Sequence, residues 1–205
     1  MGPENRRIFN GLAGTYVNKW CAPGRERERI KKIAEAMGLE KGMKVLEPGC
    51  GKGEFSPFIL EHIKENGFLY LADVSEKMLQ CAEENTEKFE NIKILRCCAC
   101  DTGIKKGSLD AVAAFNCFPH FYPKQKFINC FMELLKENGI LVIAHSRPMG
   151  FINKMHRQYG FDAGKYSLPD KRSMNAMLEK AGLKTEKYIN KGYYLLKARK
   201  IKRTD

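Results

Sequence analysis

Residues 45–53 read Val-Leu-Glu-Pro-Gly-Cys-Gly-Lys-Gly, a short apolar strand that runs directly into a turn with glycines at alternate positions. Glycine permits a tight strand-to-helix turn and the close approach of a ligand to the backbone. The glycine spacing is G-x-G-x-G rather than the G-x-G-x-x-G of dinucleotide-binding proteins. In addition, Glu47 lies two positions ahead of the first glycine, and a carboxylate suits a cationic ligand better than a pyrophosphate. The turn therefore predicts a cationic ligand at the end of a strand.

Strands and helices alternate along the chain around this turn. Hydrophobic spacing predicts helices at 25–37, 54–66, 75–88, 124–137 and 171–180, and strands at 43–46, 68–72, 92–97, 109–115, 140–144, 184–190 and 193–200. Such alternation is typical of a parallel sheet with helices on both faces. Lys191-Gly192 joins the last two strands like a hairpin, so one edge strand is expected to run antiparallel.

The predicted fold class is therefore α/β, a Rossmann-like, doubly wound, mostly parallel seven-stranded sheet with one antiparallel edge strand. We expect a single domain over residues 1–205, because a chain of this length can bury one α/β core. Residues 1–24 are predicted to form an N-terminal helical lid. Residues 145–170 are predicted to form an insertion after the fifth strand.

Two further acidic residues follow the next two strands. Asp73 closes the second strand and Asp101 follows the third. Ligands of such sheets bind beyond the carboxyl ends of the strands, so these acids and Glu47 are expected to meet one ligand. A carboxylate at Asp73 can accept both hydroxyls of a ribose, and Asp101 can accept from an adenine amino group. S-adenosylmethionine (SAM), which carries a sulfonium, an amino group and a ribose diol, fits this set.

Four motifs occur in a recognisable order: residues 45–53, Ala72-Asp73-Val74-Ser75-x-x-Met78-Leu79, Asp101-Thr102, and Leu109-Asp110-Ala111-Val112. In this order they resemble the motifs of class I SAM-dependent methyltransferases. The most similar subgroup is that of small-molecule enzymes such as the ubiquinone/menaquinone-biosynthesis (methyltransferase type 11) enzymes. The resemblance covers residues 5–146 and implies an enzyme that uses SAM and releases S-adenosylhomocysteine.

The resemblance implies which residues hold the amino-acid end of SAM. Glu47, Gly49 and Gly51 would line the methionine moiety, and Asn116 would lie beneath it. Tyr16, in a Phe-Asn-x-x-Ala-x-x-Tyr stretch of the lid, looks like the tyrosine that reaches the SAM carboxylate.

The resemblance also implies the residues at the nucleoside end. Asp73 would hold the ribose and Val74 would lie against the adenine. Asp101 and the Thr102 amide would meet the adenine edge. The stretch from Asp101 to Asp110 is shorter than is usual in the family and lacks the common Leu-Pro-Phe.

The fourth strand leads into Phe-Asn-Cys-Phe-Pro-His-Phe, residues 115–121, where the transferred methyl group should lie. The Asn/Asp-Pro-Pro-Tyr/Phe motif of amino-group methyltransferases is absent, which weighs against methylation of nucleic-acid amines. Methyl transfer is an in-line displacement at a sulfonium carbon, so the protein must mainly align the acceptor and, where needed, remove a proton. His120 or His145 is the predicted catalytic base, because a histidine suits proton removal at neutral pH.

The insertion supplies the predicted acceptor-binding residues. They are Arg147, His156 and Arg157, and the two arginines would suit an acidic acceptor. Two other interpretations of the histidines remain, a packing role and a metal site. Because no ligand spacing is diagnostic, no metal site is predicted.

The formal net charge of +12 suits an anionic partner. However, the lysines are scattered, and the one dense run, residues 197–203, has no interleaved aromatic residues. The leading hypothesis is therefore methyl transfer to a small-molecule acceptor, anionic or aromatic, with nucleic acid less favoured as a partner. An RNA- or protein-directed methyltransferase and a non-catalytic SAM-binding protein remain as alternatives, and an oxidoreductase is rejected.

The composition also bears on the compartment. Residues 1–10 lack the apolar core of a secretory signal, and no run reaches the roughly 18 apolar residues of a membrane span. We therefore expect a cytoplasmic protein whose eight cysteines are free thiols. Cys97-Cys98-x-Cys100 is not a usual zinc spacing, and small buried side chains at a strand end are expected there.

Overall fold

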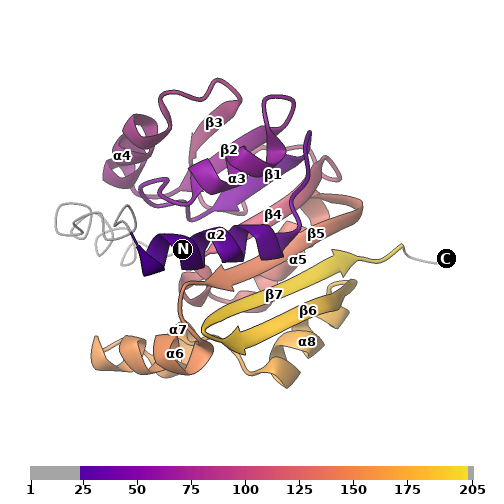
Figure 1. Cartoon of the computed structure of the whole chain (residues 1–205). Coiled ribbons are helices and arrows are strands. Elements are labelled where there is room, and N and C mark those ends of the chain that lie inside the picture. The colour runs from indigo at the N-terminus through magenta and orange to yellow at the C-terminus, as the bar shows by residue number, and fades with distance from the viewer. Residues whose placement is uncertain (1–23, 203–205) are drawn as a thin grey trace.

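The computed structural model describes residues 24–202, and Figure 1 shows its elements in chain order. The predicted lid and its Tyr16 lie outside the described residues. The strands are β1 Lys44–Pro48, β2 Phe68–Asp73, β3 Ile92–Arg96, β4 Leu109–Phe115, β5 Leu135–His145, β6 Leu183–Lys191 and β7 Tyr193–Lys200. The helices are α2 Arg25–Met37, α3 Ser56–Ile63, α4 Glu76–Thr86, the 3₁₀ turn η1 Phe118–His120, α5 Lys124–Leu134, α6 Met149–Gln158, α7 Ala163–Tyr166 and α8 Lys171–Lys180.

The seven strands form one sheet in the order β3-β2-β1-β4-β5-β7-β6. β1 to β5 pair in parallel, whereas β7 pairs antiparallel with both β5 and β6. The predicted mostly parallel, seven-stranded α/β fold is confirmed. One detail differs, because the antiparallel strand β7 lies one position in from the edge and β6 forms the edge itself. The tight link at Gly192 (φ 79°) lets β7 fold back between β6 and β5.

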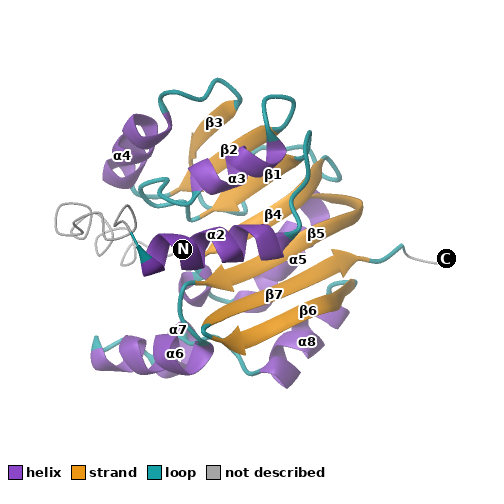
Figure 2. Cartoon of the chain, in the orientation of Figure 1, coloured by secondary structure: helices purple, strands orange, loops and turns teal. Residues whose placement is uncertain are grey.

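Helices cover both faces of this sheet (Figure 2). α2, α3 and α4 contribute to one buried cluster, and α5 and α8 contribute to the other. The central strands β4 and β5 are therefore buried on both faces, which explains their near-continuous apolar sequence. No helix within residues 24–202 has the length and apolar character needed to cross a membrane.

Several helix ends follow from local sequence chemistry. Ser75, the first residue of the helix predicted at 75–88, caps α4 by accepting a hydrogen bond from the Met78 amide at 3.3 Å. Asp170 caps α8 in the same way by accepting from the Ser173 amide at 2.9 Å. α2 ends at Gly38, whose left-handed backbone (φ 71°) is the usual end of a helix.

Two segments differ from their predicted structure. The helix expected over 124–137 ends at Leu134, because Leu135 already pairs with Leu109 and begins β5. The insertion expected at 145–170 lies between β5 and α8, and it contains two helices, α6 and α7, for which no prediction was made. Figure 1 shows both helices at the end of the sheet toward which the β5 arrow points.

The turn after β1 is possible only with glycine. Gly49 (φ 66°) and Gly51 (φ 56°) both have left-handed backbones, and the Gly49 amide donates to the Ala72 carbonyl at 2.7 Å. A Cβ atom on Gly49 would lie 2.9 Å from Cys117 Cβ, whereas a Cβ on Gly51 would have no atom within 4 Å. Gly49 therefore allows close packing against Cys117, which follows β4, whereas Gly51 faces open space.

We predict that Gly49→Ala destabilises the protein more than Gly51→Ala. Both variants carry the cost of a left-handed non-glycine residue, roughly 1–2 kcal/mol. Only Gly49→Ala adds an overpacking cost of about 1–3 kcal/mol, because Cys117 Cβ is fixed to the backbone. Urea unfolding of the two variants and the parent measures the difference. Equal losses of unfolding free energy would contradict the close packing at Gly49.

Candidate active site

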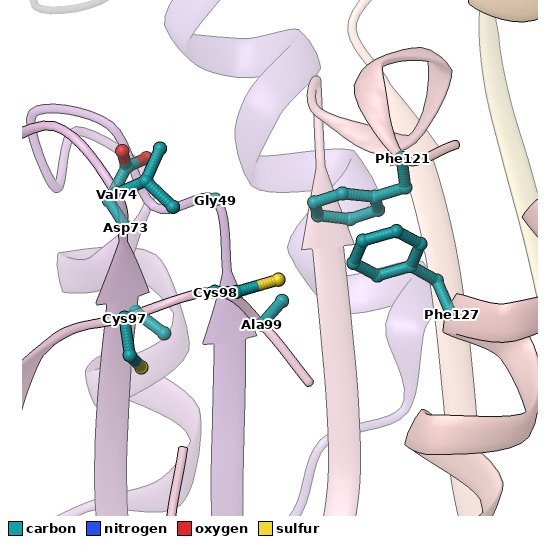
Figure 3. Close-up of a pocket in the computed structure, with 9 residues that line it drawn as sticks. Gly49, Asp73, Val74, Cys97, Cys98, Ala99, Phe121 and Phe127 are labelled. Atoms are coloured by element: carbon teal, nitrogen blue, oxygen red, sulfur yellow. The ribbon is translucent and has the colours of Figure 1, made fainter. Parts of the chain in front are cut away.

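A crevice opens at the carboxyl ends of β1 and β2, where α/β sheets of this kind bind their ligands. Figure 3 shows the residues around it, with Asp73 and Val74 at the end of β2 and the rings of Phe121 and Phe127 across from them. The lining residues are Gly49, Ala72, Asp73, Val74, Cys97, Cys98, Ala99, Phe121 and Phe127.

Asp73 is held rigidly at the end of β2. One carboxylate oxygen accepts from the Gly51 amide at 3.1 Å, and the other accepts from the Ser75 amide at 2.9 Å. Burial raises the pKa of Asp73, and these amide donors oppose that rise. Each oxygen keeps a second lone pair, so the carboxylate can still accept two hydroxyls of a ligand.

Glu47 is a buried carboxyl group beside the glycine turn. It is 2% exposed, and Ser56 Oγ donates a hydrogen bond to its Oε2 at 2.6 Å. No salt bridge joins Glu47 to another residue in the described part of the chain. Burial raises the pKa of Glu47 to about 8, and the Ser56 hydrogen bond only partly offsets this rise. A ligand cation placed beside Glu47 would stabilise its ionised form.

Cys117 lies beneath the glycine turn. Its thiol donates to the Pro48 carbonyl at 3.0 Å. Burial, and then the charges of Glu47 and Asp73, raise the pKa of this thiol well above its ordinary value. The thiol therefore stays protonated, which favours the packing role over the role of nucleophile or ligand.

The structure places the predicted adenine-edge residues outside the crevice. The Asp101 amide donates to the Cys98 carbonyl at 2.8 Å, and this turn leaves Asp101 exposed. Thr102 instead lines a second hollow of about 340 Å³, with Lys93 and Lys105 among its other lining residues. Cys98 and its neighbour Ala99 occupy the crevice wall in their place. Both residues follow β3 closely along the chain, where the sequence predicts only small buried side chains.

The aromatic wall of the crevice was not predicted. The Phe121 and Phe127 rings stack at 4.7 Å between centroids with an interplanar angle of 18°. Phe121 is the last residue of the 115–121 motif, and Phe127 comes from the first turns of α5. A flat apolar group can pack against such a pair.

Asn116 joins the ends of β4 and β5. Its backbone is left-handed (φ 53°), a conformation that asparagine tolerates better than most residues. Its side-chain oxygen accepts a hydrogen bond from the Ser146 backbone amide at 3.0 Å. The backbone amide of Asn116 donates to the Ala144 carbonyl. Asn116 therefore holds the loop that leads to the predicted acceptor side.

Three histidines come together next to this loop. The rings of His120 and His156 lie 5.0 Å apart, and His145 interacts electrostatically with both. Burial lowers the pKa of His120 and of His145 to about 3, and the neighbouring histidines add to the shift. Both imidazoles are therefore uncharged at neutral pH and are weak bases.

Burial also lowers the pKa of His156, and its hydrogen bond with the Tyr166 backbone opposes this shift. Its Nδ1 lies in hydrogen-bond contact with the carbonyl oxygen of Tyr166, which can only accept, so Nδ1 carries the proton. The other ring nitrogen of the neutral imidazole is then an acceptor.

The two predicted arginines lie apart from the histidines. Arg147 is exposed, and its guanidinium nitrogen lies 3.4 Å from a carboxylate oxygen of Glu26 in α2. The same guanidinium lies over the ring of Phe151, 5.6 Å from the ring centroid. Arg157 is exposed on α6. The cation that does approach the histidines is Lys124, which the sequence did not indicate. Burial lowers its pKa to about 8.

A metal site is not evident in this part of the molecule. Within residues 24–202, no group of three or more histidine, cysteine, aspartate or glutamate residues is placed to hold an ion. The described cysteines are free thiols, and Cys97 and Cys98 face the crevice.

Comparisons with known proteins agree with this geometry. Residues 39–197 match the family model described as a methyltransferase domain. The ubiquinone/menaquinone biosynthesis C-methyltransferase UbiE of Cronobacter sakazakii is 23% identical over 211 aligned positions, which cover 90% of this chain and 84% of that protein. A SAM-dependent methyltransferase of Aquifex aeolicus has the same fold, with a TM-score of 0.74, 20% identity and coverage of 94% and 98% of the two chains.

A further structural relative is the geranyl diphosphate C-methyltransferase of Streptomyces coelicolor, solved with Mg²⁺, geranyl diphosphate and S-adenosylhomocysteine. Its TM-score is 0.74, its identity 11%, and the match covers 97% of each chain. The match to the family model covers well over half of the chain. The protein therefore belongs to the methyltransferase-domain family and is a SAM-dependent methyltransferase.

Proposed function

We propose that the protein transfers the methyl group of SAM to a small-molecule acceptor by in-line displacement. The observation that carries this proposal is the buried carboxyl group of Glu47, which has no cationic partner in the described chain and lies beside the glycine turn. A buried carboxylate needs a compensating charge, and SAM supplies cationic groups at this end of the crevice.

Each SAM moiety has a proposed set of contacts. Glu47, Gly49 and Gly51 face its methionine part, with Asn116 beneath it. Asp73 accepts the two ribose hydroxyls, because its free lone pairs point away from the amides that hold it.

The adenine ring is proposed to lie between Val74 and the aromatic wall of Phe121 and Phe127. The resemblance assigns its edge to Asp101 and Thr102. The crevice lining favours Cys98 and Ala99 for this contact.

In the chemical step, the main task of the protein is to align the acceptor with the methyl group of SAM. A lone pair or carbanion of the acceptor attacks the methyl carbon while the carbon–sulfur bond breaks. The sulfur keeps that electron pair and S-adenosylhomocysteine leaves. A proton lost by the acceptor would not rest on His120 or His145, because their pKa values of about 3 make them poor proton acceptors at neutral pH. We propose that these imidazoles orient the acceptor by hydrogen bonds instead of acting as strong bases.

The acceptor is proposed to be small because two of the histidines, His145 at the end of β5 and His156 in α6, are only 2% and 5% exposed. The name of the Cronobacter relative suggests methylation at carbon in the synthesis of an aromatic quinone. The predicted anionic acceptor has less support, since Arg147 is engaged with Glu26.

A second candidate, an RNA-directed methyltransferase, rests on the hollow that contains Thr102. Its lining includes Lys44, Lys93 and Lys105, none of which forms an ion pair with another described residue. This function would show as RNA binding that weakens steeply with salt. Salt-independent or undetectable RNA binding would remove it.

We expect Asp73→Ala to lose SAM affinity by at least tenfold in a calorimetric titration. The variant removes charge-assisted hydrogen bonds, each worth about 1.5–3 kcal/mol. Asp101→Ala is the matched control and should bind SAM almost as the parent does, because Asp101 is exposed outside the crevice. A larger loss in Asp101→Ala than in Asp73→Ala would overturn the proposed position of the nucleoside.

SAM binding should release a proton from Glu47. In the free protein the pKa of Glu47 is about 8, so the group is mostly protonated at pH 7. A bound cation lowers that pKa, so SAM affinity should rise with pH up to about 8. Calorimetry at pH 7 in two buffers of different ionisation enthalpy should detect about one proton released per SAM. In Glu47→Gln this release should vanish, and its persistence there would assign the proton to another group.

The histidine pKa values are open to direct measurement. We expect the imidazole proton resonances of His120 and His145 not to titrate between pH 5 and 8, because burial keeps both rings neutral. The variants His120→Asn and His145→Asn assign the two signals. A titration midpoint near 6.5 for either ring would restore it as a candidate base.

A further inference from the structure

Two buried polar atoms at the acceptor side lack hydrogen-bond partners within residues 24–202. They are Nε2 of His145 and the hydroxyl oxygen of Tyr194. Tyr194 is fully buried and His145 is 2% exposed. A buried donor or acceptor that makes no hydrogen bond destabilises the protein, and native structures rarely keep one without a reason. Two such atoms on side chains in ring contact therefore point to a group that both of them bind.

Strand register brings the two side chains together. His145 is the last residue of β5, and the antiparallel ladder pairs it directly with Tyr194 at the second position of β7. Directly paired residues project from the same face of a sheet. Their ring centroids lie 6.1 Å apart at an angle of 73°.

This pair lies next to the segment after β4, where the transferred methyl group is expected. The carboxyl end of β5 adjoins Ser146, which Asn116 holds beside the end of β4. Tyr194 belongs to the same buried cluster as Ile152 and Leu168 of the insertion. Tyr194 is thus on the face of the sheet whose buried cluster includes residues of the insertion.

The rings that contact the pair are aromatic. The ring of Tyr188 packs edge-on against Tyr194 at 5.7 Å between centroids. His120 and His156 are the electrostatic neighbours of His145. Lys124 donates to backbone carbonyls of Pro119 and Lys165, and Lys171 covers the ring of Tyr188 at 5.2 Å. Both cations are engaged with these groups, so an ionised ligand group would lose its hydration here without gaining an unengaged opposite charge.

We propose that His145 and Tyr194 form a two-point hydrogen-bonding site for one oxygen atom, a hydroxyl or carbonyl, of an uncharged methyl acceptor. The phenol donates to this oxygen, and the imidazole accepts from a hydroxyl or donates to a carbonyl. This inference rests on the proposed function and makes Tyr194 a residue that positions the acceptor and selects for it. A single ordered water molecule is the competing occupant.

Tyr194→Phe tests the proposal because it removes only the hydroxyl group. The thermal unfolding midpoint of the unliganded variant should equal or exceed that of the parent, since a buried hydroxyl without a partner is lost. Titration with S-adenosylhomocysteine should be unchanged, because Tyr194 does not line the nucleoside crevice. A lower unfolding midpoint would show that the hydroxyl is satisfied within the free protein, by water or otherwise, and would overturn the proposal.

The binding test uses phenol and toluene, two probes that differ mainly in the hydroxyl group. With S-adenosylhomocysteine bound, the parent should bind phenol about tenfold more tightly than toluene. Tyr194→Phe should lose that preference, whereas the matched control Tyr188→Phe should keep it.

Equal binding of the two probes by the parent, or an unchanged preference in Tyr194→Phe, would overturn the oxygen site. Failure of S-adenosylhomocysteine to bind the parent would instead overturn the proposed function, so the two failures are distinguishable.

Discussion

The hydrogen bond from the Gly51 amide to Asp73 joins the turn after β1 to the end of β2, and the crevice depends on it. It requires a left-handed backbone at Gly51 and a carboxylate that ends the neighbouring strand. The same carboxylate accepts from the Ser75 amide at the start of α4, so one side chain fixes a turn, a strand end and a helix start. A ligand that binds Asp73 therefore meets a group whose orientation is already set, and little ordering cost remains.

Electrostatics divides the site into two unlike halves. The SAM half holds the buried carboxyl of Glu47, whose pKa is raised to about 8 and which gains a partner when a cation arrives. The acceptor half holds imidazoles whose pKa values of about 3 keep them neutral. This division suits a reaction that consumes a sulfonium charge on one side and aligns an uncharged nucleophile on the other. It also explains why the exposed Arg147, paired with Glu26, contributes little to the buried acceptor side.

Much of this structure follows from short stretches of sequence, because its determinants are local. The turn at 45–53, the cap at Ser75 and the acid at Asp73 each depend on a few neighbouring residues, and the structure has them where the sequence predicts. Contacts set by distant segments could not be predicted in this way. The backbone bond from Asp101 to Cys98 turns the loop after β3 and moves Thr102 out of the crevice. Tyr194 meets His145 only through the register of β7, which inserts between β5 and β6.

The central claim is that the crevice beside Gly51 and Asp73 binds SAM through its carboxyl groups. A crystal structure with S-adenosylhomocysteine measures this most directly. The account predicts both ribose hydroxyls within hydrogen-bond distance of the Asp73 carboxylate, with the amino group of the ligand on the Glu47 side of the turn. A ligand bound elsewhere, or one whose ribose makes no contact with Asp73, would contradict it.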